Sequence, residues 1–352
     1  MNARERLLAV LHGQTPDKCP VAPFGELIPR SFFEREYRSR GMGYVRHMSS
    51  VSEFLKDIRV TTEVLGNVKK EVFHTSHGDI SNEYTYIYGA SNDGYVQTKH
   101  PICESGDYDA MLEVVNNTAF SLDNSLDEYT EFLLGGEGIT HSWTFEPPYM
   151  GMQYYLGLER WTFDQTDHAD KFFSLMSAMD DMQKRRMELV KLSGQEIINI
   201  GNLAGNFSPA AFEEYMAPYF MKYSAYLKRY GKKCTIHADA GNLLQHKDII
   251  PRLGCDIVEA FTPPPVGNLS LADARKAWGE GITIWINFPE SVFLEGYEQT
   301  RRFALDLLRS DPCPNKIIGT TESGFVGVGM DKIRLFIEGY HAILDAVDEM
   351  VV

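Results

Sequence analysis

A regular alternation of apolar and amphipathic segments, from about residue 135 to the end of the 352-residue chain, constrains the fold most strongly. The apolar segments predict strands at 137–145, 196–203, 232–239, 255–261, 282–288 and 315–321. They are apolar almost end to end, which is typical of parallel strands covered on both faces. Such a series forms a (β/α)8 barrel or an open doubly wound sheet. A first buried strand is also predicted at 19–26, with a proline near each end. Because no G-x-G-x-x-G motif follows this first strand, we expect the α/β fold of a TIM barrel.

The N-terminal part of the chain departs from this alternation. A short helix is predicted at 3–12, as an N-terminal extension, and a second helix at 52–65 between a serine cap and a terminating glycine. Between 67 and 102, β-rich pieces separated by turn sequences predict inserted hairpins. Residues 107–134 return to helix. We therefore predict a single barrel domain over 1–352, with 67–102 as a β-hairpin insertion.

Charge and cysteine content restrict the partners and the compartment. The chain has 34 basic and 49 acidic residues and a net charge of −15, which disfavours binding to nucleic acid or to an anionic membrane surface. The chain has five cysteines, an odd number, and they are widely spaced. This pattern predicts reduced thiols and no disulfide framework. The N-terminus is too charged for a signal peptide, and no run of 18 apolar residues occurs. We expect a cytoplasmic protein.

Polar residues end or follow the predicted strands, at the edge where a TIM barrel holds its active site. They are Glu26, His141, Glu146, Asn199, Asn202, His237, Asp239, Glu259, Asn287 and Glu322. One such residue alone is ordinarily a hydrogen-bonded wall residue or a solvated carboxylate. Several on converging strands are costly to gather without a cation or a proton-transfer task. The candidate catalytic residues are Glu26, His141, Glu146 and Asn202.

One imidazole and three carboxylates of this set make a candidate metal site, formed by His237, Asp239, Glu259 and Glu322. Zinc takes nitrogen and oxygen ligands tetrahedrally, and a catalytic site leaves one position for substrate. His237 and Asp239 are two residues apart on one predicted strand and so share a face. The same groups also suit acid–base catalysis without a metal. The residues alone leave both chemistries open.

Aromatic and methionine side chains near the same strand ends predict an apolar pocket for a planar substrate. A loop predicted at 147–155 is too long and too rich in proline and glycine to serve packing alone, and 261–268 predicts a rigid loop at the mouth. The candidate substrate-binding residues are Trp143, Tyr149, Met150, Phe207, Phe261 and Asn287.

Four segments of the sequence resemble motifs of a known family, and they occur in the same order. They are ARERLLAVLHGQTPDKCPV at the start, SEFLKDIRV, SPAAFEEYMAPYFMKYSAYLKRYGKKCTIHADAGN and IIGTTESG. Together they resemble the uroporphyrinogen decarboxylase superfamily over nearly the whole chain, and the inserted hairpins are similar in place. The SEFLKDIRV segment resembles an early helix of that superfamily.

Two branches of the superfamily differ in their motifs. Its decarboxylases carry R-Q-A-G-R after the first strand, where this chain reads FGELIPRSF and offers only Arg30. Its zinc-dependent corrinoid methyltransferases carry H-x-C, in which His237 matches the histidine and Asp239 takes the place of the cysteine. Glu259 matches a glutamate of related methionine synthases, and Glu322 stands near the final cysteine of the branch.

Carboxylates in place of thiolates imply a harder, more Lewis acidic zinc, suited to a leaving oxygen. The resemblance therefore implies the first component of an O-demethylase. Such a methyltransferase moves a methyl group from a methoxylated, aromatic or other methylated small molecule to the cob(I)alamin of a partner corrinoid protein. Glu146 or Tyr149 would protonate the leaving oxygen, and a homodimer is a further expectation. The alternatives are a decarboxylase of the uroporphyrinogen type, a non-catalytic small-molecule-binding barrel and a metal hydrolase.

Overall fold

A computed structural model describes residues 1–25, 27–87, 94–143, 145–203, 207–238, 242–321 and 329–351. The chain divides into two compact units. The first comprises Met1–Ser50, Asn124–Thr144 and Gly194–Val352, and the second comprises Val51–Asp123 and Phe145–Ser193. In the part of the chain that the structure describes, no helix has the length and apolar character needed to cross a membrane.

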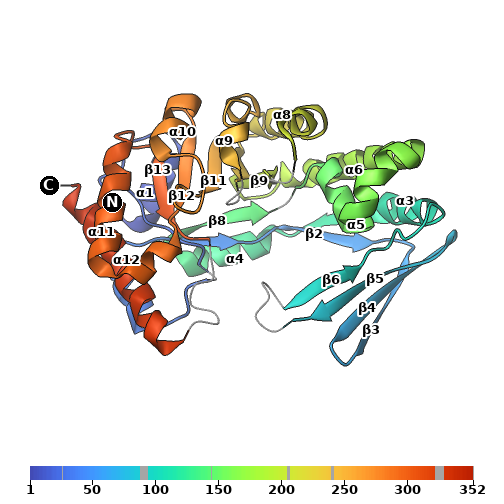
Figure 1. Ribbon diagram of the computed structural model, residues 1–352, viewed down its shortest axis with the longest axis horizontal. Coiled ribbons are helices and arrows are strands. Elements are labelled where there is room, and N and C mark those ends of the chain that lie inside the picture. Colours follow the sequence, from blue (N-terminus) through green and yellow to red (C-terminus); the bar gives the residue numbers. More distant parts are fainter. Residues whose placement is uncertain are drawn as a thin grey trace. The chain divides into compact units, whose positions relative to one another are not determined.

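The first unit is built on a curled sheet of seven parallel strands (Figure 1). In spatial order they are β1 (Tyr44–His47), β8 (Gly138–Trp143), β9 (Ile197–Asn202), β10 (Lys233–His237), β11 (Ile257–Phe261), β12 (Thr283–Asn287) and β13 (Lys316–Gly319). The six strands predicted between 137 and 321 all form, and β1 is a seventh that the sequence did not predict. The α/β character and the parallel sheet of the predicted TIM barrel are thus confirmed.

Residues 20–25 connect the two edge strands of this sheet. On one side the Ala22 N–H donates to the Ile318 carbonyl (2.7 Å), and on the other the Gly25 N–H donates to the Val45 carbonyl (2.9 Å). Two prolines in this segment lack the N–H that a regular ladder requires. The segment therefore pairs through isolated bridges, and the continuous strand predicted at 19–26 does not form over the described residues 20–25.

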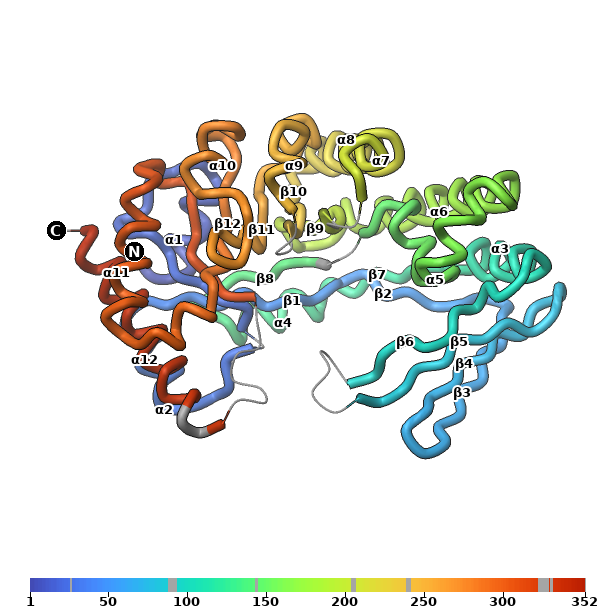
Figure 2. The backbone as a smooth tube through the Cα atoms, viewed as in Figure 1, coloured from blue at the N-terminus to red at the C-terminus, as the bar shows by residue number. Residues whose placement is uncertain are grey.

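Helices alternate with the strands of the first unit from β9 to the C-terminus (Figure 2). The α-helices of this unit are α1 (Ala3–Leu11), α2 (Phe32–Ser39), α4 (Asn124–Leu134), α7 (Pro209–Ala211), α8 (Ala217–Lys228), α9 (Leu243–His246), α10 (Leu271–Trp278), α11 (Tyr297–Ser310) and α12 (Met330–Glu349). Short η1 (Phe212–Met216), a π-helix, and η2 (Ile250–Arg252) and η3 (Glu290–Glu295), both 3₁₀-helices, complete the set. This order of elements produces the strand–helix pattern predicted from the sequence.

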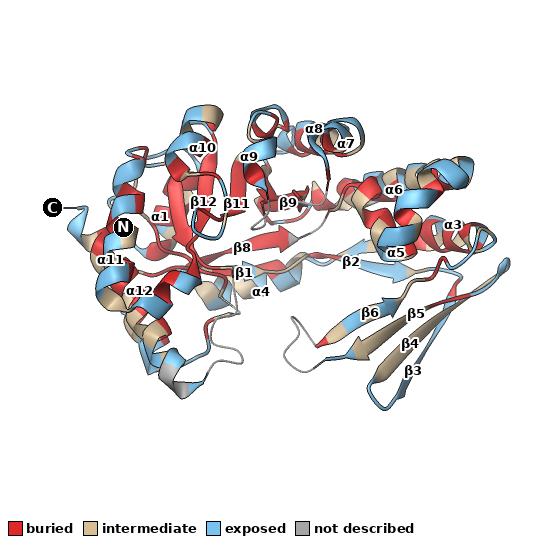
Figure 3. Ribbon diagram, viewed as in Figure 1, coloured by how far each residue is buried: buried red, intermediate tan, exposed pale blue. Residues whose placement is uncertain are grey.

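The N-terminal helix closes one end of the sheet interior. Its Leu7, Val10 and Leu11 side chains pack against inward-facing strand residues. These strand residues together with Ala22 of the segment 20–25, called the interior cluster below, are Ala22, Val45, Ile139, Ile197, Ile257, Trp285 and Ile317. Strands β10 to β13 are buried almost throughout (Figure 3). Since side chains two positions apart on a strand share a face, the interior cluster identifies which later residues also point inward.

Two β-bulges occur on the strands that flank β10. On β9, residues from Asn199 to Asn202 lie opposite only Thr235 to His237, and Gly201 in the extra position has φ +136°. On β11 a similar shift falls between Val258 and Phe261. A bulge bends its strand and re-aims the side chains beside it. Both bulges lie near the C-terminal ends of their strands, where polar residues replace apolar ones.

Ala260, in the β11 bulge, has a left-handed backbone with φ +55°. This conformation costs an alanine about 1–2 kcal/mol, and glycine adopts it freely but loses more entropy on folding. We expect Ala260→Gly to raise the free energy of unfolding by about 0.5–1 kcal/mol, measured by urea denaturation. The control Ala274→Gly, within helix α10, should lower it. A loss of stability in Ala260→Gly would contradict the strain at this position.

Within its described residues, the second unit contains two antiparallel sheets and three helices. One sheet pairs β2 (Val51–Leu55) with β7 (Thr118–Leu122). The other has the order β3 (Arg59–Leu65), β4 (Val68–Thr75), β5 (Gly78–Tyr86) and β6 (Tyr95–Lys99). The helices are α3 (Asp107–Asn117), α5 (Pro148–Asp167) and α6 (Ala169–Val190). The antiparallel hairpins predicted within 67–102 are therefore present.

Three local predictions in this region need correction. The helix predicted at 52–65 is wrong, because this segment forms β2 and β3. Its second half is rich in β-branched residues, which favour strands, and Gly66 lies in the turn between β3 and β4. The helix predicted at 107–134 is interrupted by β7. The segment 147–155, predicted as a loop, begins helix α5, where a proline fits the first turn.

Candidate metal centre

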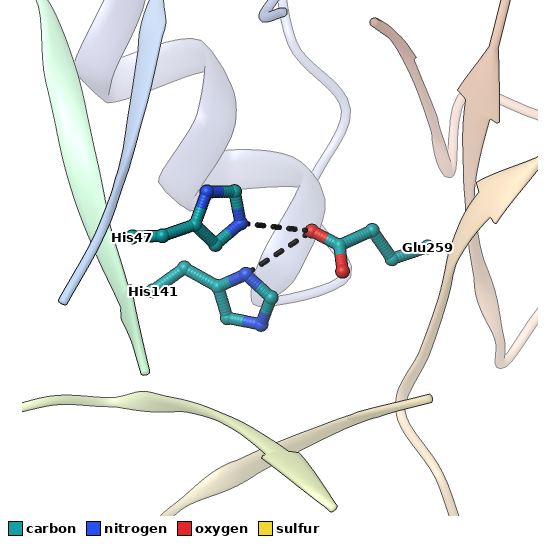
Figure 4. Close-up of side chains that lie close together, drawn as sticks. All are labelled: His47, His141 and Glu259. Carbon is teal, nitrogen blue, oxygen red and sulfur yellow. Dashed lines mark ion pairs between the residues drawn. The ribbon is translucent and has the colours of Figure 1, made fainter. Parts of the chain in front are cut away.

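Four side chains from two pairs of neighbouring strands meet inside the sheet of the first unit. His47, the last residue of β1, is the register partner of His141 on β8. His237, the last residue of β10, is the register partner of Glu259 on β11. His47, His141 and Glu259 each follow a member of the interior cluster by two positions, so all three point inward. Figure 4 shows both imidazoles directed at the same carboxylate oxygen.

Three nitrogen and oxygen atoms converge in a geometry that could hold a metal ion. The His141 Nδ1 atom lies 3.1 Å from Oε1 of Glu259, and His47 Nε2 lies 3.6 Å from the same oxygen. All three atoms lie within 4.8 Å of one another. Two ligands bound about 2.1 Å from a tetrahedral zinc ion lie about 3.4 Å apart. The observed separations fall on either side of that value.

Burial and hydrogen bonding support a metal ion between these groups. The His141 and Glu259 side chains have no exposed surface. Among the described residues, neither His141 Nδ1 nor Glu259 Oε1 has a hydrogen bond of acceptable geometry. Buried polar atoms are rarely left in this state, because each costs about 1–3 kcal/mol. A cation placed between them would satisfy both, so the donor set fits a metal ion.

The protonation states of the two buried groups also suit metal binding. Burial lowers the pKa of His141 from its usual value, and this effect outweighs the attraction of Glu259. Burial raises the pKa of Glu259, but the neighbouring imidazoles, above all that of His141, hold it well below its usual value. A neutral imidazole and an ionised carboxylate are the forms that bind metals. His237 Nδ1 lies 3.3 Å from the second oxygen, Oε2, of the same carboxylate.

Thr235 contacts the imidazole ring of His141 at Nε2, on the side opposite to Glu259. The His141 Nε2 atom lies 2.7 Å from the buried Thr235 Oγ1. When Nε2–H donates to this oxygen, the lone pair of Nδ1 faces Glu259 Oε1, as a metal ligand requires. An outer hydrogen bond of this kind orients the ligand and selects its tautomer. Thr235 is therefore a positioning residue for His141.

Removing the Thr235 hydroxyl tests this arrangement. Thr235→Val keeps the shape of the side chain but loses the acceptor, and we expect the zinc affinity to fall about 10–100-fold. Thr235→Ser keeps the hydroxyl and should retain most of the affinity. The measurement is competition for zinc against a chromophoric chelator. Equal affinities in the valine and serine variants would show that Thr235 does not position His141.

Aromatic rings form an apolar wall around the donor atoms. The Phe24 ring packs edge-on against His47, with centroids 4.1 Å apart, and lies 6.4 Å from His237. Trp285 stacks beside His141 at 6.3 Å. Such a wall limits water access and strengthens electrostatic interactions within it.

The structure brings together three of the residues singled out from the sequence, namely His141, His237 and Glu259. Glu26, Asp239 and Glu322 lie outside the described residues, as does the side chain of Trp143. Asn202 ends β9 opposite His237. Of the four predicted metal ligands, only His237 and Glu259 are therefore among the described residues.

The remaining candidates lie in both units. In the first unit, the buried Asn287 donates from Nδ2 to Thr262 Oγ1 (2.9 Å) and accepts from the Thr321 N–H. Phe207 and Phe261 are also buried there. In the second unit, the Tyr149 hydroxyl donates to Gln165 (2.7 Å), and Met150 and Glu146 are half-buried.

His47 was missed by the sequence analysis. It ends a strand of only four residues, whose sequence YVRH contains two basic side chains and offers no apolar run. The prolines and glycines between residues 19 and 43 could have indicated this strand. They mark turns before and after a short helix, and such turns are expected between elements of an α/β fold. Recognition of β1 would have placed His47 at a strand end beside His141.

Comparisons with known proteins identify a shared fold but do not assign the chain to a family. No family model and no curated protein sequence matches the chain. A methyltransferase from Methanosarcina mazei matches over 100% of both chains with a TM-score of 0.60 and 12% sequence identity. A ribulose-1,5-bisphosphate carboxylase/oxygenase from Pyrococcus horikoshii OT3 matches 94% of this chain and 59% of its own, with a TM-score of 0.37 and 9% identity. At these identities the first match indicates a shared fold, and the second carries no argument.

Proposed function

We propose that the protein is a cytoplasmic, zinc-dependent methyltransferase that takes a methyl group from an ether oxygen of a small, methoxylated aromatic compound. The acceptor is cob(I)alamin on a partner corrinoid protein. One observation carries the proposal, namely the convergence of His47, His141 and Glu259 at the ends of parallel strands. The fold likeness to a methyltransferase supports the reaction class, and the sequence motifs support the uroporphyrinogen decarboxylase superfamily. In this proposal residues 20–25 serve as the eighth strand of a (β/α)8 barrel.

Each protein group has a distinct part in this reaction. Zinc, when bound, supplies a Lewis acid that makes an ether oxygen a better leaving group. His47, His141 and Glu259 would hold it. The imidazole of His237 donates to Oε2 of Glu259 and keeps the carboxylate oriented. The rings of Phe24 and Trp285 keep water from the donor atoms.

Other elements of the proposal come from the sequence resemblance. Asp239 and Glu322 are proposed as further zinc ligands, and Glu26, Glu146 and Asn202 as groups that bind or protonate the substrate. A homodimer and a single domain over 1–352 stay predictions.

Metal content and turnover test the proposal in that order. The purified protein should bind one equivalent of zinc, measured by elemental analysis, and lose it in His141→Ala. With zinc, a corrinoid protein in the Co(I) state and methoxybenzene, the absorbance should change to that of methylcobalamin. Absence of metal from every preparation, or binding that is indifferent to His141, would contradict the zinc site. A zinc-loaded protein that leaves Co(I) unchanged with all methoxylated aromatics would contradict the reaction.

A further inference from the structure

We propose that Asn199 is a substrate-contacting residue whose Nδ2 group donates a hydrogen bond to the oxygen atom that the methyl group leaves. The inference rests on the proposed function and assigns a residue to the leaving oxygen. It starts from a buried amide whose oxygen is hydrogen-bonded and whose nitrogen has no hydrogen-bond partner among the described residues.

Asn199 lies on β9, between the strand that carries His141 and the strand that carries His237. It follows Ile197 of the interior cluster by two positions, so its side chain points inward. Its register partner on β10 is Thr235, the residue bonded to His141 Nε2. Asn199 is therefore an immediate neighbour of Thr235, the residue that positions the metal ligand His141.

The two ends of the Asn199 amide are distinguishable. Its Oδ1 accepts from the backbone N–H of Gly201 at 2.8 Å, within the β9 bulge. A backbone N–H only donates, so the oxygen must face it and the amide cannot be reversed. The Nδ2 group is buried, with the residue 3% exposed, and has no hydrogen-bond partner among the described residues. The bulge thus holds a donor ready for an acceptor atom that the described chain does not provide.

An oxygen that gains negative charge is the acceptor this donor fits best. In the proposed step the methyl–oxygen bond breaks and its electron pair stays on the oxygen. Co(I) supplies the pair for the new cobalt–carbon bond and becomes Co(III), and the phenolate released takes a proton from one of the acids proposed above or from water. A fixed donor stabilises the growing charge more strongly than it stabilises the neutral ether. Asn199 would therefore act mainly on the rate of methyl transfer.

The main test variant is Asn199→Asp, which keeps Oδ1 for the Gly201 N–H and removes the donor. Asn199→Ala removes both, and provides a second variant should the added carboxylate prevent folding. The matched control is Asn315→Asp, because that amide is satisfied at both ends, by the Glu280 carbonyl (2.9 Å) and by Thr283 Oγ1 (2.6 Å). Circular dichroism and zinc content establish that each variant is folded and loaded.

Two ethers with different leaving groups separate charge stabilisation from a structural role. With methoxybenzene we expect kcat of Asn199→Asp to fall about 100-fold or more with little change in KM. With 4-nitromethoxybenzene, whose leaving oxygen carries less charge, the loss should be smaller. Asn315→Asp should retain parental rates with both ethers. An equal loss with both ethers in the Asn199 variants would contradict the proposal.

Phenol binding provides a readout that requires no turnover. Titration calorimetry of the zinc-loaded protein with phenol should give an affinity that is about 10-fold weaker in Asn199→Asp. Equal affinities, or no binding of phenol by the parental protein, would overturn the assignment of Asn199. If phenol binding depends on Asn199 but no ether is demethylated, the proposed function fails and the oxygen-binding assignment stands.

Discussion

Replacing Glu259 by glutamine should abolish stoichiometric zinc binding. Both oxygens of this fully buried carboxylate are engaged, Oε1 by His47 and His141 and Oε2 by His237. Glutamine keeps the shape but removes the negative charge, the only one in the described donor set. Loss of an outer hydrogen bond costs about 10–100-fold in metal affinity, so loss of a ligand should cost more than about 100-fold. Elemental analysis and chelator competition measure the effect.

A second buried glutamate provides the control for this variant. Glu290, in η3 after β12, is 6% exposed and accepts from the Tyr340 hydroxyl at 3.2 Å. Glu290→Gln removes a buried charge of the same kind outside the donor set, and zinc content should stay at one equivalent. Retention of tight zinc binding in Glu259→Gln would show that the metal, if bound, lies elsewhere in the chain.

The largest effect on stability is expected for Trp285→Ala. Trp285 is 1% exposed, belongs to the interior cluster, and donates from Nε1 to the Ala22 carbonyl at 3.2 Å. Truncation leaves a cavity in the centre of the sheet, and such changes cost about 3–5 kcal/mol. Urea denaturation followed by circular dichroism should show the free energy of unfolding reduced by that amount. Zinc affinity should also fall, because His141 loses the ring beside it.

Two comparison variants separate packing from hydrogen bonding at this position. Trp285→Phe retains an aromatic ring but loses the bond to Ala22, and should cost about 1–2 kcal/mol. Leu244→Ala, at a residue 49% exposed, should change stability by less than about 0.5 kcal/mol. A cost for Trp285→Ala no greater than that of Leu244→Ala would contradict its place in the core.

The sequence predicted the parts of the fold that local pattern controls. The strands from β9 to β13 are largely apolar and buried on both faces, so their composition identifies them. Strand β1 is short and carries Arg46 and His47, and its pairing with β8 on one side and with residues 23–25 on the other keeps it extended. The same limit affected 52–65, where a serine and a glycine suggested helix caps. In the structure β2 pairs with the distant strand β7, and the β-branched run of β3 pairs with β4 in a hairpin. In both places, pairing with other strands determines the conformation.

The candidate site shows a related limit. His141, His237 and Glu259 could be singled out because polar residues stand at the ends of apolar strands. Which atoms face each other depends on register and on the bulge at Ala260, and neither has a local signal. The contact of His47 with Glu259 joins residues more than half the chain apart. Thr235 had the sequence context of an ordinary strand residue. Its role depends on its contact with Nε2 of His141, which the sequence does not reveal.

The segment 20–25 has a consequence for how this protein reaches its native state. Its bridge to Ile318 joins the beginning of the chain to its last strand, so this pairing is among the most non-local contacts in the fold. Contacts of such separation form late, because closing a long loop costs entropy before the contact can compensate for it. During synthesis the side of this segment that pairs with β13 stays open until residues 316–319 have emerged from the ribosome, whereas its other side can pair early with the nearby Val45. The backbone at Val21 and Ala22 is therefore the place where incomplete chains are most exposed to mispairing.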